Sequence, residues 1–189
     1  MRIAIPVMAL LIGASAVCAQ DGGSAKPAGL EADWEIAAVL HEISLHAQRL
    51  GPMLERFDAN QWVQKGASQT YVAQLQSCRE QATALARGAE ALTANPQQLS
   101  GELEIFFRMQ SLETMLGSLE EGMRKYHSQA DAQALAVFEA QDDANRDRLQ
   151  RYIVNLAAQR EQEFKVMDRE AQRCRGLVIQ APPRGGRKK

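Results

Sequence analysis

Apolar residues recur every three or four positions along most of this 189-residue chain, the spacing that places them on one face of an α-helix. The first such stripe predicts a helix that begins near Asp33 and continues to Phe57. Pro52 follows Gly51 within it, and because proline lacks a backbone donor we expect a kink there. The alternating steps of four and three are those of a coiled coil, and the stripe consists of Ile36, Leu40, Ile43, Ala47, Leu50, Leu54 and Phe57.

Two further stripes with the same spacing follow. They predict helices over 68–95 and 97–127, with Pro96 ending the first helix and allowing the second to start at once. The connector over 58–66 contains Trp62, which is too apolar for a free loop, and we expect it to cover one end of a helical bundle. The two stripes consist of Tyr71, Leu75, Cys78, Ala82, Leu85, Ala89 and Leu92, and of Ile105, Met109, Leu112, Leu116, Leu119, Met123 and Tyr126.

The last apolar stripe, over 129–175, is interrupted. Leu135 opens it and Leu149 resumes it, but acidic and amide residues crowd 142–145. We expect the helix to break there and the chain to reverse. Residues 146–175 would then descend antiparallel to the second predicted helix.

Composition agrees with this helical pattern. Ala, Leu, Gln and Glu account for 83 residues, whereas Val, Ile and Thr account for only 21. The first group favours helices and the second favours strands, which argues against a β-sandwich, a β-barrel or a wound α/β sheet. The chain is therefore predicted to be all-α. We expect an antiparallel helical bundle of four to five long amphipathic helices with coiled-coil-like packing over 31–180, between flexible segments at 20–30 and 181–189.

Residues 1–19 have the pattern of a cleavable export signal. Arg2 precedes an uncharged apolar stretch, and small residues end at Ala19, which fits cleavage before Gln20. Two alternatives are a lipoprotein with its lipid on Cys18 and an uncleaved anchor. No later apolar run is long enough to span a bilayer, so we expect a soluble periplasmic or secreted protein without a transmembrane segment in its mature chain.

Export would leave two cysteines, Cys78 and Cys174, in an oxidising compartment. An even pair of cysteines in an exported chain predicts a disulfide bond. The predicted reversal near 142–145 would bring the two helices that carry them together. The alternative is two unpaired thiols on apolar helix faces.

A candidate for metal binding lies in the first predicted helix. Glu42 and His46 are four residues apart and so share a helix face. The zinc-protease motif needs its two histidines four apart, and His41 and His46 are five apart, so that motif fails. The alternative for Glu42 and His46 is a polar pair beside the apolar stripe.

Recognisable catalytic patterns are missing from the sequence. The chain contains no C-x-x-C, no haem-attachment run, no glycine-rich phosphate loop and no G-x-S-x-G elbow. The acidic pairs stand at spacings that point in different directions on a helix. We therefore expect no enzyme and predict no cofactor.

The C-terminal end differs from the rest of the chain in charge. Residues 20–180 hold 17 basic against 23 acidic residues, a net charge of −6, whereas the last nine residues hold four basic ones and no acid. This basic end is a candidate for weak contact with an anionic surface, and its alternative role is to solubilise the chain. No aromatic residue accompanies it to stack on bases, so we expect no specific nucleic acid. The four are Arg184, Arg187, Lys188 and Lys189.

Two functional hypotheses follow from these observations. The first is an exported, non-enzymatic helical bundle that acts through protein contacts as a scaffold, adaptor or chaperone-like binder, with self-association open. The second is a bundle of the cell envelope that binds a metal or a small ligand in its interior. The sequence names no partner.

Overall fold

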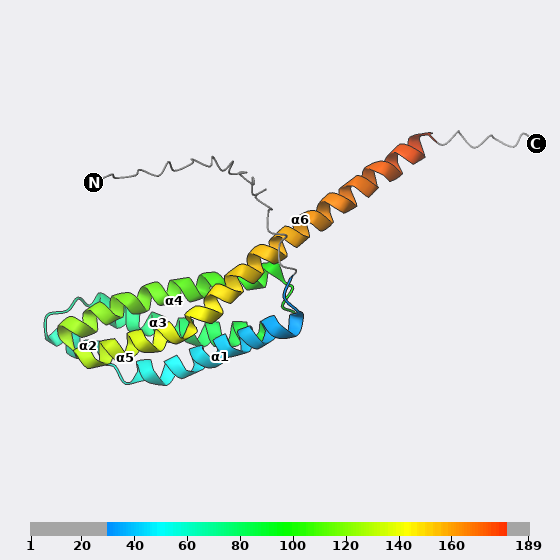
Figure 1. The fold of residues 1–189 in the computed structure, drawn as a ribbon. Helices are drawn as coiled ribbons and strands as arrows, with labels where there is room; N and C mark the ends of the chain where they lie inside the picture. The colour runs from blue at the N-terminus through cyan, green and yellow to red at the C-terminus, as the bar shows by residue number, and fades with distance from the viewer. Residues whose placement is uncertain (1–29, 181–189) are drawn as a thin grey trace, which may run out of the picture.

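The computed structural model describes residues 30–180, and its helices form the predicted all-α bundle (Figure 1). Three long helices run up, down and up, and two consecutive helices form the fourth arm, antiparallel to α1 and α4. The short helix α2 closes one end of the bundle. The elements are α1 (Asp33–Glu55), α2 (Ala59–Gln64), α3 (Thr70–Leu92), α4 (Leu99–Tyr126), α5 (Gln129–Glu139), a 3₁₀ turn η1 (Ala140–Asp142) and α6 (Asp143–Gln180).

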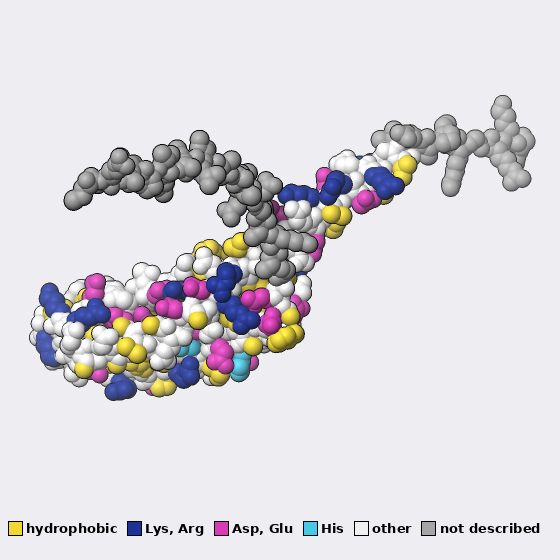
Figure 2. Space-filling view, viewed as in Figure 1, with side chains coloured by type: hydrophobic (Ala, Val, Ile, Leu, Met, Phe, Trp, Pro, Cys, Tyr) yellow, Lys and Arg dark blue, Asp and Glu magenta, His cyan; other side chains and the backbone are white. Residues whose placement is uncertain are grey.

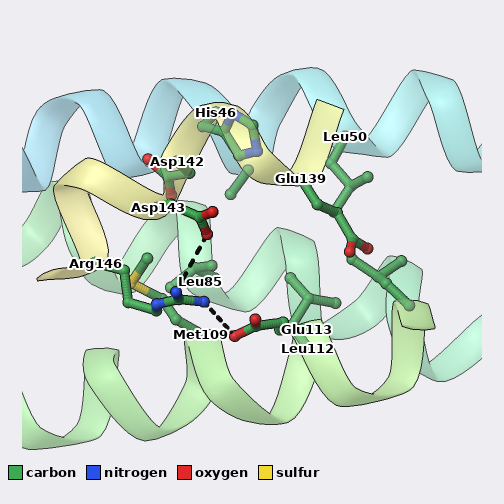
Figure 3. Close-up of a pocket in the computed structure, with 12 residues that line it drawn as sticks. His46, Leu50, Leu85, Met109, Leu112, Glu113, Glu139, Asp142, Asp143 and Arg146 are labelled. Carbon is green, nitrogen blue, oxygen red and sulfur yellow. Dashed lines mark ion pairs between the residues drawn. The ribbon is translucent and has the colours of Figure 1, made fainter. Parts of the chain in front are cut away.

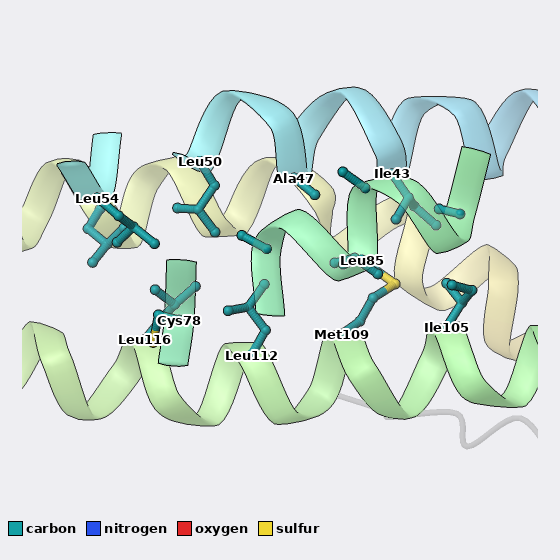
Figure 4. Packing of buried hydrophobic residues seen from close by; sticks show 14 of the residues in the cluster. Ile43, Ala47, Leu50, Leu54, Cys78, Leu85, Ile105, Met109, Leu112 and Leu116 are labelled. Carbon is teal, nitrogen blue, oxygen red and sulfur yellow. The ribbon is translucent and has the colours of Figure 1, made fainter. Parts of the chain in front are cut away.

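The core follows the predicted apolar stripes. Side chains from α1, α3 and α4 interlock along the bundle axis, as Figure 4 shows for Leu50, Leu85 and Leu112. Small residues such as Ala82 and Ala89 are fully buried and allow α1 and α3 to approach closely. The helix α1 continues through Pro52 to Glu55, so the proline does not end it.

The connector after α1 covers one end of the bundle, as expected. Trp62 in α2 is fully buried and packs edge-on against Tyr71, with 6.0 Å between ring centroids. The side chain of Asp58 accepts a hydrogen bond from the backbone N–H of Asn60 and caps α2. Arg79 of α3 donates to the last carbonyl oxygens of the α1 region, which ties the connector to the next helix.

At the opposite end, a buried hydrogen bond anchors the fourth arm to the turn between α3 and α4. The hydroxyl of Tyr152 in α6 donates to the backbone oxygen of Pro96 at 3.0 Å. Leu156 is the last fully buried residue among those whose burial the structure describes. Beyond it, α6 leaves the bundle and projects as a single helix (Figure 1).

The expected chain reversal near 142–145 is wrong. The break exists, but it is only the three-residue turn η1, and α6 continues away from α5 in the same general direction (Figure 1). The polar residues do not form a loop. Asp142 is buried and accepts a hydrogen bond from Asn145 at 2.8 Å, while Asp143 begins α6.

The expected disulfide between Cys78 and Cys174 is wrong for the same reason. Cys78 lies fully buried in α3, within the bundle, whereas Cys174 is exposed on the projecting part of α6. Both thiols are free. Without a reversal, nothing brings α6 back toward Cys78.

Other expectations fall on residues that the structure does not describe. The export signal over 1–19, the leader up to residue 29 and the basic residues Arg184, Arg187, Lys188 and Lys189 all lie outside 30–180. Among the described helices, none has the length and apolar character needed to cross a membrane.

Candidate functional site

A small cavity opens where α1, α3, α4 and the η1–α6 junction meet (Figure 3). Its volume is about 70 Å³, which is far below the several hundred Å³ of a typical pocket for a cofactor-sized ligand. One wall is apolar, with Leu50 and Leu112 among its side chains, and the other wall is charged. The lining consists of His46, Ala47, Leu50, Leu85, Met109, Leu112, Glu113, Leu116, Glu139, Asp142, Asp143 and Arg146.

His46 forms part of this cavity from the α1 side. The imidazole is buried and stacks on Phe138, with ring centroids 4.2 Å apart. Burial, and then the positive charge of Arg49, lower the pKa of His46 to about 4. The ring is therefore neutral at pH 7 and acts as an apolar, stacking side chain.

Three carboxyl groups line the cavity from the fourth arm, Glu139, Asp142 and Asp143, and burial raises the pKa of the first two. Burial, and then the negative charges of Glu120 and Glu113, raise the pKa of Glu139 to about 8. One of its oxygens, Oε1, is buried without a hydrogen-bond partner among the described residues. Burial also raises the pKa of Asp142, against the hydrogen bond from Asn145 that lowers it.

Arg146 closes the charged wall. Its guanidinium contacts Glu113 of α4 at 2.6 Å and Asp143 at 3.2 Å, so it joins α6 to α4 across the cavity (Figure 3). The Glu113 carboxylate raises the pKa of Arg146, which stays charged. The wall therefore combines a fixed ion pair with a carboxyl group, Glu139, that favours its protonated form.

The predicted pair of Glu42 and His46 is split by this arrangement. Glu42 is exposed on the outside of α1, whereas His46 is buried in the cavity. Within residues 30–180, no three His, Cys, Asp or Glu side chains are grouped as metal ligands would be. The two residues remain a sequence-based prediction without a third ligand.

The second candidate feature is the projecting segment, defined as residues 158–177 of α6. Nearly all of its side chains are exposed. Phe164 and Met167 are 68% and 62% exposed. Apolar and charged side chains alternate along it in Figure 2. The bundle helices, in contrast, bury their apolar stripes. A helix that projects alone with an apolar stripe lacks the neighbour that normally covers such a stripe.

Comparisons of the chain with protein-family models, with curated proteins and with solved structures find no match. The interpretation of both features therefore depends on their geometry. Sequence reasoning missed Glu139 and Arg146 as cavity residues, although their spacing contains a signal. Both stand on the stripe that joins Leu135 to Leu149, at steps of four and three.

Proposed function

We propose that the protein is exported and works as a non-enzymatic helical bundle that binds protein through the projecting segment of α6. The observation that carries this proposal is the exposure of Phe164 and Met167 on a helix that extends beyond its own bundle. Exposed apolar side chains on a rigid helix are typical of helix-mediated recognition, in which a partner covers the apolar face. The bundle then serves as the base that holds this helix in place.

The anchoring of α6 supports the same role. Tyr152 fixes it to Pro96, and Arg148 contacts Glu31 at 2.8 Å, just before the helix leaves the bundle. A binding helix fixed at its base loses less conformational freedom on binding than a flexible segment does.

Site-specific photo-crosslinking in the producing cell tests this proposal. A photoreactive phenylalanine analogue is introduced at Phe164 and, as the control, at Phe107, which is 60% exposed on α4 of the bundle. We expect protein adducts from position 164 and few from position 107, with mass spectrometry to identify the attached chain. Adducts absent from position 164, or equal at both positions, would contradict the proposal.

Export is tested separately by N-terminal sequencing. Cleavage at the predicted site gives a chain that begins with Gln20. An intact Met1, or a lipid on Cys18, would show that the signal was misinterpreted.

The cavity favours a second candidate, the binding of a small ligand inside the bundle. The observation behind it is the buried, unpartnered Oε1 of Glu139 beside an apolar wall. Elemental analysis and native mass spectrometry of protein purified without a histidine tag test it. Stoichiometric metal or a bound small molecule would favour this second function over the first.

A further inference from the structure

The apolar stripe of the projecting segment is separate from the stripe that faces the bundle. The bundle stripe ends at Leu156, and its next two positions are occupied by Arg160 and Glu163, which form an ion pair at 2.9 Å. The new stripe begins at Phe164, eight residues after Leu156, which on a helix of 3.6 residues per turn is a rotation of about 80°. The projecting segment therefore has an apolar face of its own.

This face has the spacing of a two-stranded coiled coil. Phe164, Met167, Ala171 and Cys174 follow one another at steps of three, four and three. The segment covers 20 residues, which corresponds to a helix about 30 Å long. Two large side chains at one end and two small ones at the other suit an antiparallel pair of identical helices. In that pair Phe164 faces Cys174 of the second copy and Met167 faces its Ala171.

The charge of the chain selects the same direction. Residues 30–168 hold 13 basic and 21 acidic residues, a net charge of −8, whereas residues 169–189 hold seven basic and one acidic, a net charge of +6. A parallel pair would place the two basic ends side by side. An antiparallel pair places each basic end beside the acidic bundle of the other copy, which is the electrostatically favourable arrangement.

The bundle end that would receive this basic segment is acidic. Gln97 donates to Asp33 at 2.9 Å and accepts from Arg160 at 3.3 Å, so the start of α1 lies beside the base of the projecting segment. Glu35 follows Asp33 and is partly exposed, whereas Glu31 already contacts Arg148 at 2.8 Å. In a pair centred near residue 169, residue 177 of one copy lies across from Glu161 of the other, near this end.

The charged residues beside the apolar stripe do not distinguish the antiparallel from the parallel arrangement. In the antiparallel pair Glu161 faces Arg175 of the second copy, but Asp168 faces Asp168 of that copy and Glu170 faces its Glu170. In a parallel pair Glu163 would face Asp168 of the second copy, while Glu170 would face its Arg175. These exposed pairs nearly balance in the two directions, so the opposite net charges of the two regions dominate.

We propose that the projecting segment pairs antiparallel with the same segment of a second copy of this chain. The inference rests on the proposed function, because it names the partner of the face that Phe164 and Met167 form. The product is a dimer with two bundles at opposite ends of a two-helix connection.

Sedimentation velocity of the full chain tests the pairing. We expect a dimer that dissociates on dilution, more readily at 500 mM than at 50 mM salt. Changing Phe164→Ser together with Met167→Ser should weaken dimerisation about 100-fold or more, because four large apolar side chains per dimer are lost. The matched control changes Phe107→Ser and Val137→Ser, which are similarly exposed on the bundle, and should dimerise as the parent does.

All of these substitutions replace exposed side chains, so thermal melting should stay near that of the parent and show that each variant is folded. A monomeric parent at 100 µM and 50 mM salt would overturn the inference. Dimerisation that survives in the Phe164 and Met167 double variant would also overturn it.

Oxidative crosslinking tests the direction. In the antiparallel pair the two copies of Cys174 lie about ten residues apart along the axis, or about 15 Å, which is too far for a disulfide. A Phe164→Cys and Cys174→Ser double variant, mixed with the parent, should form a crosslinked heterodimer. Cys78 is buried in the core and serves as an internal control. Efficient crosslinking of the parent alone through Cys174 would indicate a parallel pair and refute the proposed direction.

The inference and the proposed function can fail separately. A monomeric chain whose position 164 crosslinks to a different protein in the cell would refute self-pairing and leave the proposed function intact. A dimer whose position 164 crosslinks only to the same chain would support both, whereas a chain whose position 164 gives no protein adducts would contradict the proposed function itself.

Discussion

The buried carboxyl group of Glu102 gives the sharpest prediction about stability. Glu102 lies in the first turn of α4 and is fully buried, and both of its side-chain oxygens lack a hydrogen-bond partner among the described residues. Burial raises the pKa of Glu102 from 4.5 to about 8. The folded state therefore holds this proton over a pH range in which the unfolded state has already lost it.

The sign of the effect follows from proton linkage. Because the pKa of Glu102 is higher in the folded than in the unfolded state, its contribution to the free energy of unfolding falls as pH rises from 4.5 to about 8. Each pH unit in this range costs about 1.4 kcal/mol, so a rise from pH 5 to pH 7 costs about 3 kcal/mol. This is a large fraction of the roughly 5–15 kcal/mol that stabilises a typical domain.

Other groups also titrate in this range, so a variant is needed to isolate Glu102. Glu139 acts in the same direction, because its pKa is also raised to about 8. His46 acts in the opposite direction, because its lowered pKa makes stability fall as pH drops from 6.5 toward 4. The substitution Glu102→Gln keeps the shape, removes the titration, and leaves the other groups unchanged.

Urea unfolding followed by circular dichroism at pH 5, 6, 7 and 8 and constant ionic strength measures the effect. We expect the free energy of unfolding of the parent, minus that of Glu102→Gln, to decrease by about 3 kcal/mol from pH 5 to pH 7. Glu104→Gln is the matched control, since Glu104 is exposed on the same helix and contacts Arg108. A difference between parent and Glu102→Gln that does not change with pH would show that Glu102 is solvated.

Three further predictions concern the core and the thiols. Leu85→Asp should unfold the bundle, because it places an unpaired charge at a position where the native side chain is only 4% exposed. The expected cost is several kcal/mol, and an unchanged thermal melting curve would contradict it. Tyr152→Phe should lower the free energy of unfolding by about 1 kcal/mol through loss of the hydrogen bond to Pro96, which urea titration measures. In native protein a maleimide should label the exposed Cys174 rapidly and Cys78 hardly at all, since burial raises the pKa of the Cys78 thiol to about 12. Equal labelling rates of the two thiols would contradict the packing of α3.

Much of the bundle could be predicted from hydrophobic spacing alone. The stripes in α1, α3 and α4 matched buried residues from Ile36 to Met123, because spacing reports which face of a helix is apolar and a bundle buries those faces. Trp62 was equally predictable, since a large aromatic side chain in a short connector needs cover.

The cavity could not be predicted in this way, because polar residues on an apolar stripe resemble an interruption of the helix. Glu139, Asp142 and Arg146 occupy the positions between Leu135 and Leu149 at unbroken steps of four and three. The stripe continues through them, and its polar members line the cavity instead of leaving the core. Glu102 shows the same effect, since it stands three residues before the buried Ile105.

The direction of the last helix depends on the length of the fourth arm and on whether the chain reverses within it. From Gln129 to Gln180 the fourth arm spans 52 residues, against 28 in α4, so it must either fold back or project beyond the bundle. Folding back needs a turn that reverses the chain, such as the one that His127 and Ser128 form between α4 and α5 without Gly or Pro. Within the fourth arm only the short η1 turn forms, because a buried Asp142 bonded to Asn145 is compatible with a continuous helical path. Projection is therefore the consequence of a long segment whose break at η1 does not reverse the chain. Spacing alone could not reveal it, because an apolar stripe shows which face needs a neighbour and not which molecule supplies it.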